Sequence, residues 1–268
     1  MNDRTAALPT PSPGTDARAQ ATPARGDALS NTLQRLHLLR FPLVISVLFF
    51  HSVNPVQVVP GADASWPPFE PWAALVHGFL AHGLGGIRMP AFFAISGFLF
   101  FASHIGTREW LTRKLGSRVR GMLVPLLAWN ALLLPVLLAL QAWPPSNAYF
   151  SGLGTWSRPV ADYGPWQVLD ALLGLSGYPI VYPLWFLRDL FLMCLIAPLY
   201  LLLSRPAQAV VVGGLGLLWF SGAWPFQVPT IEALFFFSAG ALAALWRLDP
   251  APLDRHAWTV FALLVGLV

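Results

Sequence analysis

Long apolar segments separated by short polar ones dominate the chain after residue 30. They run over residues 36–53, 87–101, 122–142, 184–203, 209–224 and 231–246. A further apolar segment, 257–268, is still running where the sequence stops. A membrane helix needs about 20 apolar residues to cross a hydrocarbon core about 30 Å thick. The pattern therefore predicts an all-α polytopic membrane helix bundle, with about six to seven transmembrane helices present.

The segments between these spans differ in character. Residues 1–30 contain no apolar run and are rich in Pro, Ala, Thr and Asp, which predicts a disordered tail. We expect residues 31–268 to form one membrane domain. Residues 72–86 are apolar but interrupted by His77, His82 and several glycines, so we expect them at the membrane interface. Residues 143–181, rich in Trp, Pro, Gly and Tyr, are predicted to be a long loop.

Composition agrees with a membrane protein. The chain has 268 residues, of which 56% are hydrophobic and only 10% charged, whereas soluble domains carry about 25% charged residues. The apolar runs are continuous and longer than the alternating strands, about 10 residues each, of a membrane β-barrel. The one cysteine, Cys194, excludes a disulfide framework within the sequence. We expect no metal site and no nucleic-acid partner.

The distribution of arginine and lysine orients the predicted bundle. If the N-terminus is cytoplasmic and the spans alternate, the inside segments collect most basic residues, including a dense cluster at 108–120. The outside loops then hold only Arg158. Because cytoplasmic loops of membrane proteins are enriched in basic residues, this asymmetry predicts a cytoplasmic N-terminus and a multi-pass protein of the inner (plasma) membrane.

Two ionisable side chains lie in the first predicted span. Eleven residues at about 100° each place Arg40 and His51 on nearly one helix face, with the histidine about 16 Å deeper. Ionisable groups at such depth usually line a polar cavity. A histidine satisfied by a neighbouring helix is an equally open interpretation. Pro42 would separate the two side chains if it kinks the helix.

Four motifs in this order resemble the membrane acyltransferase-3 family, in its sugar O-acetyltransferase branch. They are the spacing of Arg40 and His51 in a first helix, MPAFFAISGFLFF (89–101), RKLGSRVRGMLVPLLAWN (113–130) with its basic loop, and PLWFLRDLFLMCLIAPL (183–199). Two features depart from the family. His37 stands where many members carry an acidic residue, and the last helices of the usual ten-helix bundle are absent. We therefore expect an acyltransferase domain that is incomplete at its C-terminus.

The resemblance implies an enzyme that moves an acyl group, commonly acetyl, from acyl-CoA to a hydroxyl of a cell-surface glycan or its lipid-linked precursor. Such an enzyme is an acyltransferase of groups other than aminoacyl groups. Acetyl-CoA would be a donor substrate, and no permanently bound cofactor is expected. His51 is the candidate general base, because imidazole titrates near pH 6.5. Arg40 is its expected partner, and membrane lipid would surround the protein.

The basic cluster at 108–120 has two interpretations. It can anchor the topology and attract anionic lipid, as cytoplasmic loops do. It can also bind the phosphates of acyl-CoA, for which the candidates are Lys114, Arg118, Arg113 and Arg120.

The candidates for substrate contacts are Trp185, Arg188, Asp189 and Arg88. Arg188 and Asp189 are adjacent, so their side chains point about 100° apart and each is expected to pair with another helix. They form either a structural ion pair or a wall of the acceptor pocket. Arg88 either contacts an anionic glycan or extends to the headgroups. Ser96 and Gly97 favour close helix packing over a serine nucleophile.

Two other functions stay open. The buried ionisable residues could line the path of a transporter or permease, although neither an internal repeat nor matching broken helices is visible. The chain could also be an inactive remnant of an acyltransferase.

Overall fold

The structure is a computed structural model that describes residues 84–102, 107–150 and 158–248, and five single positions at 34, 38, 41, 43 and 45. These five positions are helical. The chain divides into two compact units, Met1–Pro42 and Leu43–Val268. The predicted tail 1–30, most of the first span and the segment 257–268 lie outside the described residues. Arg40 and His51 lie outside them as well.

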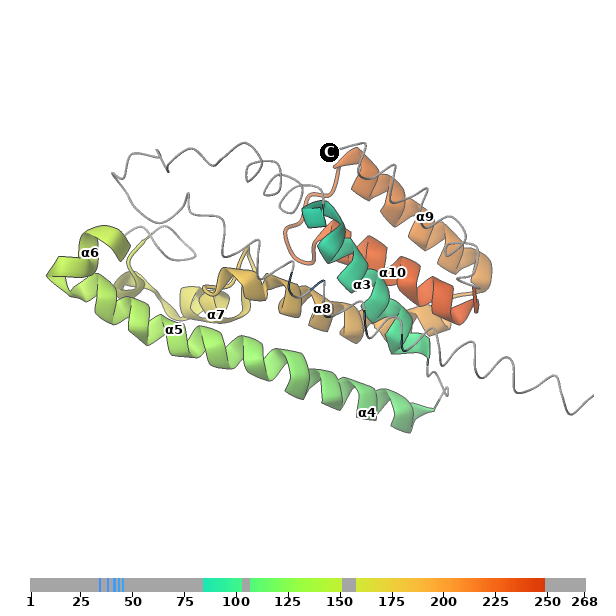
Figure 1. Cartoon of the computed structure of the whole chain (residues 1–268), viewed down its shortest axis with the longest axis horizontal. Coiled ribbons are helices and arrows are strands. Elements are labelled where there is room, and N and C mark those ends of the chain that lie inside the picture. The colour runs from blue at the N-terminus through green and yellow to red at the C-terminus, as the bar shows by residue number, and fades with distance from the viewer. Residues whose placement is uncertain are drawn as a thin grey trace, which may run out of the picture. The chain divides into compact units, whose positions relative to one another are not determined.

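The regular secondary structure in the described part of the second unit is all helical, and that part contains no strand (Figure 1). Its α-helices are α3 (Leu84–Ala102), α4 (Arg108–Arg118), α5 (Val124–Ala142), α6 (Pro144–Phe150), α7 (Pro165–Leu173), α8 (Trp185–Ile196), α9 (Arg205–Ser221) and α10 (Ile231–Leu245). A π-helix, Val119–Leu123, joins α4 to α5. Short 3-10 helices cover Val160–Asp162, Tyr182–Leu184 and Ala197–Leu202. The all-α prediction is confirmed for these residues.

Two of the described helical segments have the length and composition to cross a membrane. They are Arg108–Ala142, with 35 residues, and Tyr182–Leu202, with 21 residues. Gly86–Ala102 and Ile231–Leu245 are apolar but shorter. The predicted spans 87–101, 122–142, 184–203, 209–224 and 231–246 each coincide with a helix, within a few residues at the ends. The number of six to seven transmembrane helices stays a prediction.

The basic cluster differs from its prediction, because residues 108–118 form helix α4 rather than a loop. Thr107 caps the helix, since its hydroxyl accepts a hydrogen bond from the Trp110 amide at 3.2 Å. Glu109 in the first turn complements the helix dipole. The helix then continues through the π-helix into α5, so the cluster and the following apolar span form one continuous segment. Residues 143–181 are likewise not a plain loop, since they include α6 and α7.

Helices α3 and α10 form the most extensive helix pair of the described core, and Figure 1 shows them side by side. A Cβ atom at Gly97 would overlap the carbonyl oxygen of Phe237 and lie 2.9 Å from its carbonyl carbon. A Cβ atom at Gly240 would similarly overlap the carbonyl oxygen of Ala94. Only glycine permits backbones this close, as in small-residue contacts between membrane helices. The packing interpretation of the Ser96–Gly97 pair is therefore favoured.

Candidate functional site

Arg188 and Asp189 form a buried ion pair at the start of α8. The exposed fractions are 3% for Arg188 and 0% for Asp189, and Arg188 Nε lies 2.8 Å from Asp189 Oδ1. The two residues pair with each other, which the sequence analysis did not expect, and Asp189 in addition has the expected partner on another helix, Thr230 of α10. The guanidinium is carried on a long flexible stem, so it can turn back to its neighbour although the two Cα–Cβ bonds diverge by about 100°.

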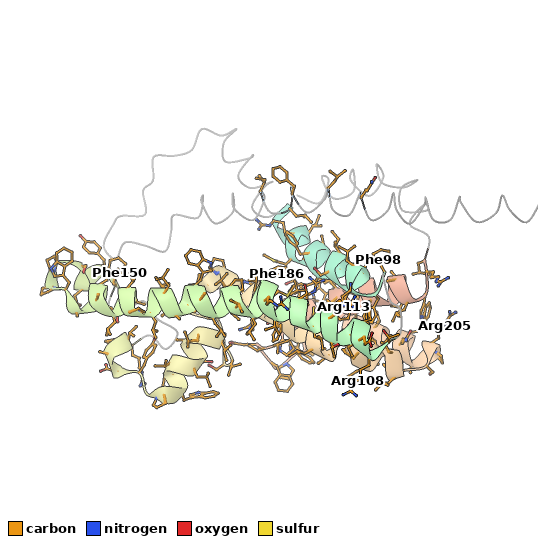
Figure 2. All side chains as sticks on the ribbon, turned by 90° about the horizontal axis from the view of Figure 1, so that it is seen from below. Phe98, Arg108, Arg113, Phe150, Phe186 and Arg205 are labelled. Carbon is orange, nitrogen blue, oxygen red and sulfur yellow. The ribbon has the colours of Figure 1, made fainter. Side chains whose placement is uncertain are left out.

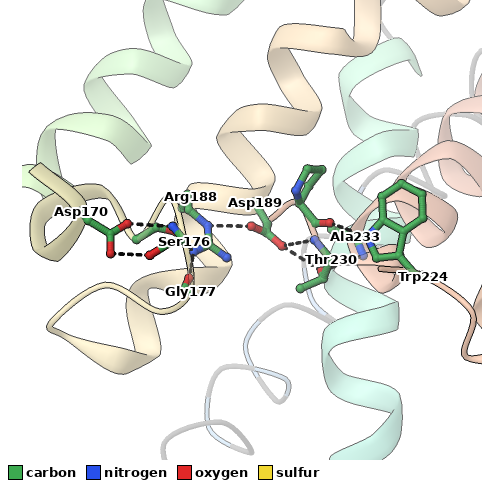
Figure 3. A network of polar contacts seen from close by, with 10 residues as sticks. Asp170, Ser176, Gly177, Arg188, Asp189, Trp224, Thr230 and Ala233 are labelled. Carbon is green, nitrogen blue, oxygen red and sulfur yellow. Dashed lines mark hydrogen bonds and ion pairs between the residues drawn. The ribbon is translucent and has the colours of Figure 1, made fainter. Parts of the chain in front are cut away.

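Arg188 also holds the turn that precedes α8, residues 174–181. Its Nη1 donates hydrogen bonds to the carbonyl oxygens of Gly174 and Gly177 (Figure 3). Gly174 ends α7 with φ of 64°, a left-handed conformation that favours glycine. Asp170 of α7 accepts two hydrogen bonds from Ser176, one from its amide and one from its hydroxyl, each at 2.7 Å. The third guanidinium nitrogen, Nη2 of Arg188, is buried and has no hydrogen-bond partner.

The second carboxylate oxygen of Asp189 connects α8 to α10. Asp189 Oδ2 accepts hydrogen bonds from the Thr230 amide at 2.9 Å and the Thr230 hydroxyl at 2.8 Å (Figure 3). Thr230 is the N-cap of α10, and its hydroxyl oxygen accepts a hydrogen bond from the Ala233 amide at 3.2 Å. One carboxylate therefore fixes both the arginine of α8 and the first turn of α10.

Asn130 of α5 holds the same turn from another side. Its amide nitrogen donates to the carbonyl oxygens of Leu126 at 2.8 Å and Leu172 at 3.0 Å. Its amide oxygen accepts from the Val181 amide at 2.7 Å. The side chain is fully buried. Asn130 thus joins α5, the end of α7 and the turn before α8.

Trp185, the third predicted substrate residue, packs between helix α3 and the turn. Its ring centroid lies 6.4 Å from that of Phe93 on α3 and 6.4 Å from that of Tyr178 in the turn. Arg88 is buried on α3, five residues before Phe93. At 1.5 Å per residue this places Arg88 about 7.5 Å further along α3. The structure brings Trp185, Arg188 and Asp189 together, with Arg88 on the helix packed against them.

The four residues predicted to bind the acyl-CoA donor lie on two faces of α4 and the π-helix that continues it. Lys114 and Arg118 are partly buried, whereas Arg113 and Arg120 are exposed. Lys114 Nζ lies 5.9 Å from the ring centroid of Phe100 and 5.7 Å from that of Trp110. Figure 2 shows Arg108 and Arg113 on α4, at the end of the long helical segment away from Phe150. Two cations thus face the core and two face outward.

The candidate acceptor residues (Trp185, Arg188 and Asp189) and the candidate donor-binding residues Lys114 and Arg118 lie at different levels along α8. Lys114 and Arg118 lie near Cys194, which is nine residues after Trp185 along the helix. Nine residues at 1.5 Å each separate these levels by about 13 Å. In the described residues no three His, Cys, Asp or Glu side chains come together in a way that could hold a metal ion. The metal and cofactor expectations stay predictions.

Comparison with known proteins identifies the family of the chain. Residues 33–268 match the acyltransferase-3 family, described as an acyltransferase domain. The chain belongs to the acyltransferase-3 family. A curated relative, the succinoglycan biosynthesis protein ExoH of Rhizobium meliloti (strain 1021), is 30% identical over 243 residues. That similarity covers 87% of this chain and 60% of the relative, so the chain spans about 60% of the length of ExoH. No solved structure matches the chain.

The residues of the polar network that the sequence analysis of this acyltransferase-3 chain did not single out include Asn130, Asp170 and Thr230. Asn130 and Thr230 complete the polar network, but their partners Val181 and Asp189 are 51 and 41 residues away. Asn130 lies within an apolar span, and a buried amide in such a span is a signal for a polar partner. Thr230 directly precedes an apolar helix, which is typical of an N-cap.

Proposed function

We propose that this acyltransferase-3 chain transfers an acyl group from acyl-CoA to a hydroxyl group of a glycan or its lipid-linked precursor. The observation that carries the proposal is the family match over residues 33–268. The similarity to a protein of succinoglycan biosynthesis supports a glycan acceptor. We propose acetyl as the acyl group, as the sequence motifs imply.

The donor would be bound at the α4 end of the structure. Lys114 and Arg118 are the better candidates for the phosphates of acyl-CoA, because partly buried cations are less screened by salt and solvent than exposed ones. Arg113 and Arg120 are exposed and suit contacts with anionic lipid headgroups. The acceptor would be bound about 13 Å away along α8, at the level of Trp185, Arg188 and Asp189.

In the proposed reaction His51 is the general base. It removes the proton of the acceptor hydroxyl while the hydroxyl oxygen attacks the thioester carbonyl. The C–S bond then breaks and releases coenzyme A, whose sulfur takes up a proton. The products are an acyl ester of the glycan and free coenzyme A. Arg40 would bind a phosphate of the donor or stabilise the environment of His51, since its planar guanidinium donates two parallel hydrogen bonds.

The protein would lie in the inner membrane as a multi-pass protein with a cytoplasmic N-terminus. The segments Arg108–Ala142 and Tyr182–Leu202 support this proposal by their length and hydropathy. A cytoplasmic N-terminus would also place the α4 basic cluster on the side where acyl-CoA is made.

His51→Ala tests the proposed reaction. We expect the variant to accumulate in membranes like the wild type but to lose acylation of the glycan, measured by mass spectrometry of cell-surface glycans. His104→Ala is the matched control and should retain acylation, because His104 is not among the residues proposed to act in the reaction. Arg40→Lys should also impair acylation, because an ammonium cannot make the two-pronged contact. Unchanged acylation by His51→Ala would disprove the role of the histidine.

A further inference from the structure

Three aromatic rings, those of Tyr178, Tyr182 and Trp185, lie close together where the chain enters α8. The ring centroids of Tyr178 and Tyr182 are 4.6 Å apart, and those of Tyr178 and Trp185 are 6.4 Å apart. The tyrosines are 47% and 49% exposed, whereas Trp185 is partly buried behind them. About half of the surface of each tyrosine is thus exposed, although both lie beside a buried polar network of the described core.

The turn 174–181, which carries Tyr178 and directly precedes Tyr182, is held by three buried polar side chains from three helices. Arg188 of α8 binds the Gly174 and Gly177 carbonyls, Asp170 of α7 binds Ser176, and Asn130 of α5 binds the Val181 amide. All three side chains are at most 3% exposed. A turn fixed in this way loses little conformational entropy when a ligand binds, which is the physical basis of preorganisation.

A polar group adjoins the tyrosines. A Cβ atom at Gly177 would lie 3.3 Å from Oε1 of Gln227, so this exposed amide lies against the turn next to Tyr178. An amide can donate and accept hydrogen bonds, and each tyrosine hydroxyl can do the same. The surface thus combines flat apolar rings with neutral donors and acceptors that carry no net charge.

These features together fit a sugar ring. Pyranose rings present flat C–H faces that pack on aromatic rings, and their hydroxyl groups form hydrogen bonds with neutral amide and phenol groups. We propose that Tyr178, Tyr182 and Gln227, backed by Trp185, form the platform that binds a sugar unit of the glycan acceptor. This inference rests on the proposed function and names the part of the site that recognises its acceptor.

The platform differs from an aromatic belt at the membrane interface. Belt residues act through general amphipathic character and need no fixed geometry, whereas here three buried side chains fix a single turn. Belt residues would change membrane anchoring when replaced, while platform residues would change binding of soluble sugar.

The test measures binding of oligosaccharides prepared from deacylated succinoglycan to the purified full chain, by isothermal titration calorimetry. We expect the Tyr178→Ala/Tyr182→Ala double variant to bind at least about tenfold more weakly, because both stacking surfaces are lost. Tyr178→Phe/Tyr182→Phe keeps the rings and should retain most of the affinity. Tyr149→Ala on α6, another tyrosine that is about half exposed, is the matched control and should bind like the wild type.

The outcomes separate this inference from the proposed function. Binding does not require catalysis, so it is measured without acetyl-CoA, when no acyl transfer can occur. If the chain binds them but never transfers an acyl group, the proposed function fails and the platform stands. If acyl transfer occurs but the double alanine variant binds and transfers like the wild type, the platform is disproved. Absence of binding by the wild type, or equal loss in the Tyr149→Ala control, would also overturn it.

Discussion

Asp189→Asn is the sharpest test of how the buried ion pair acts. The substitution keeps the size of the side chain but removes its charge and converts one carboxylate oxygen into an NH2 group. In the wild type, one oxygen accepts from Arg188 Nε at 2.8 Å and the other accepts from the Thr230 amide at 2.9 Å. Whichever way the new amide is turned, its NH2 group faces an N–H donor. One donor is then left without an acceptor in a site that is fully buried.

The expected loss of stability is large. Removing one partner of a buried ion pair costs about 3–5 kcal/mol, because the other charge is left uncompensated. For a protein of this size each kcal/mol lowers the melting temperature by about 2–4 °C, so we expect a decrease on the order of 10 °C. Thr230→Ala should have a smaller effect of about 1–2 kcal/mol, because it removes the helix cap but keeps the backbone N–H that Asp189 binds.

The assay is thermal unfolding of the purified full chain in detergent, followed by tryptophan fluorescence, with acyl transfer measured on the same samples. Asp162→Asn is the matched control, since Asp162 is exposed, and should change stability by less than about 0.5 kcal/mol. A melting temperature of Asp189→Asn equal to that of the wild type, together with lost transfer, would refute the structural role. Asp189 would then form part of the acceptor pocket, which is the second interpretation that the sequence analysis gives for it.

Two further predictions concern helix packing and donor binding. Gly97→Ala should destabilise the protein by about 1–3 kcal/mol in the same unfolding assay, because the new Cβ overlaps the α10 backbone; Gly86→Ala, with open space around it, should have no such effect. Arg118→Gln should raise the KM for acetyl-CoA about tenfold with a smaller change in kcat, since it removes a partly buried cation from the proposed phosphate site. Arg113→Gln on the exposed face should leave that KM within about twofold, and equal effects of both arginine variants would contradict the division into two faces.

The helices of the described core could be predicted from the sequence because long apolar runs are typical of helices that cross a membrane. The segments at α8 and α10 were placed within a few residues, since their apolar runs end at polar positions. Helix α4 was predicted as a loop because its composition is basic and polar, and only the capping hydroxyl of Thr107 and the acidic first turn indicate a helix. A prediction from apolar pattern alone does not take these two helix-start signals into account.

The polar network could be predicted only in part. The sequence singled out Arg188 and Asp189, because charges within an apolar run are conspicuous. It could not supply their partners, since the Gly174 and Gly177 carbonyls are backbone groups and Thr230 is 41 residues from Asp189. Asn130 was missed for the same reason. Local spacing carries information about one helix, whereas this network joins four helices (α5, α7, α8 and α10) and a turn. The roles of His51 and Arg40 stay predictions.

The π-helix at Val119–Leu123 has a consequence for how the long segment Arg108–Ala142 is mapped. The Val124 amide bonds to the carbonyl of Val119, five residues earlier, so the turn holds one residue more than an α-helical turn. That extra residue shifts the angular phase of α4 against α5 by about 100°. A helical wheel drawn in one piece through both helices would assign Lys114 to the wrong side relative to Asn130. Cross-linking or cysteine-scanning data on this segment should therefore be plotted on two separate helical wheels, one for α4 and one for α5 that starts at Val124.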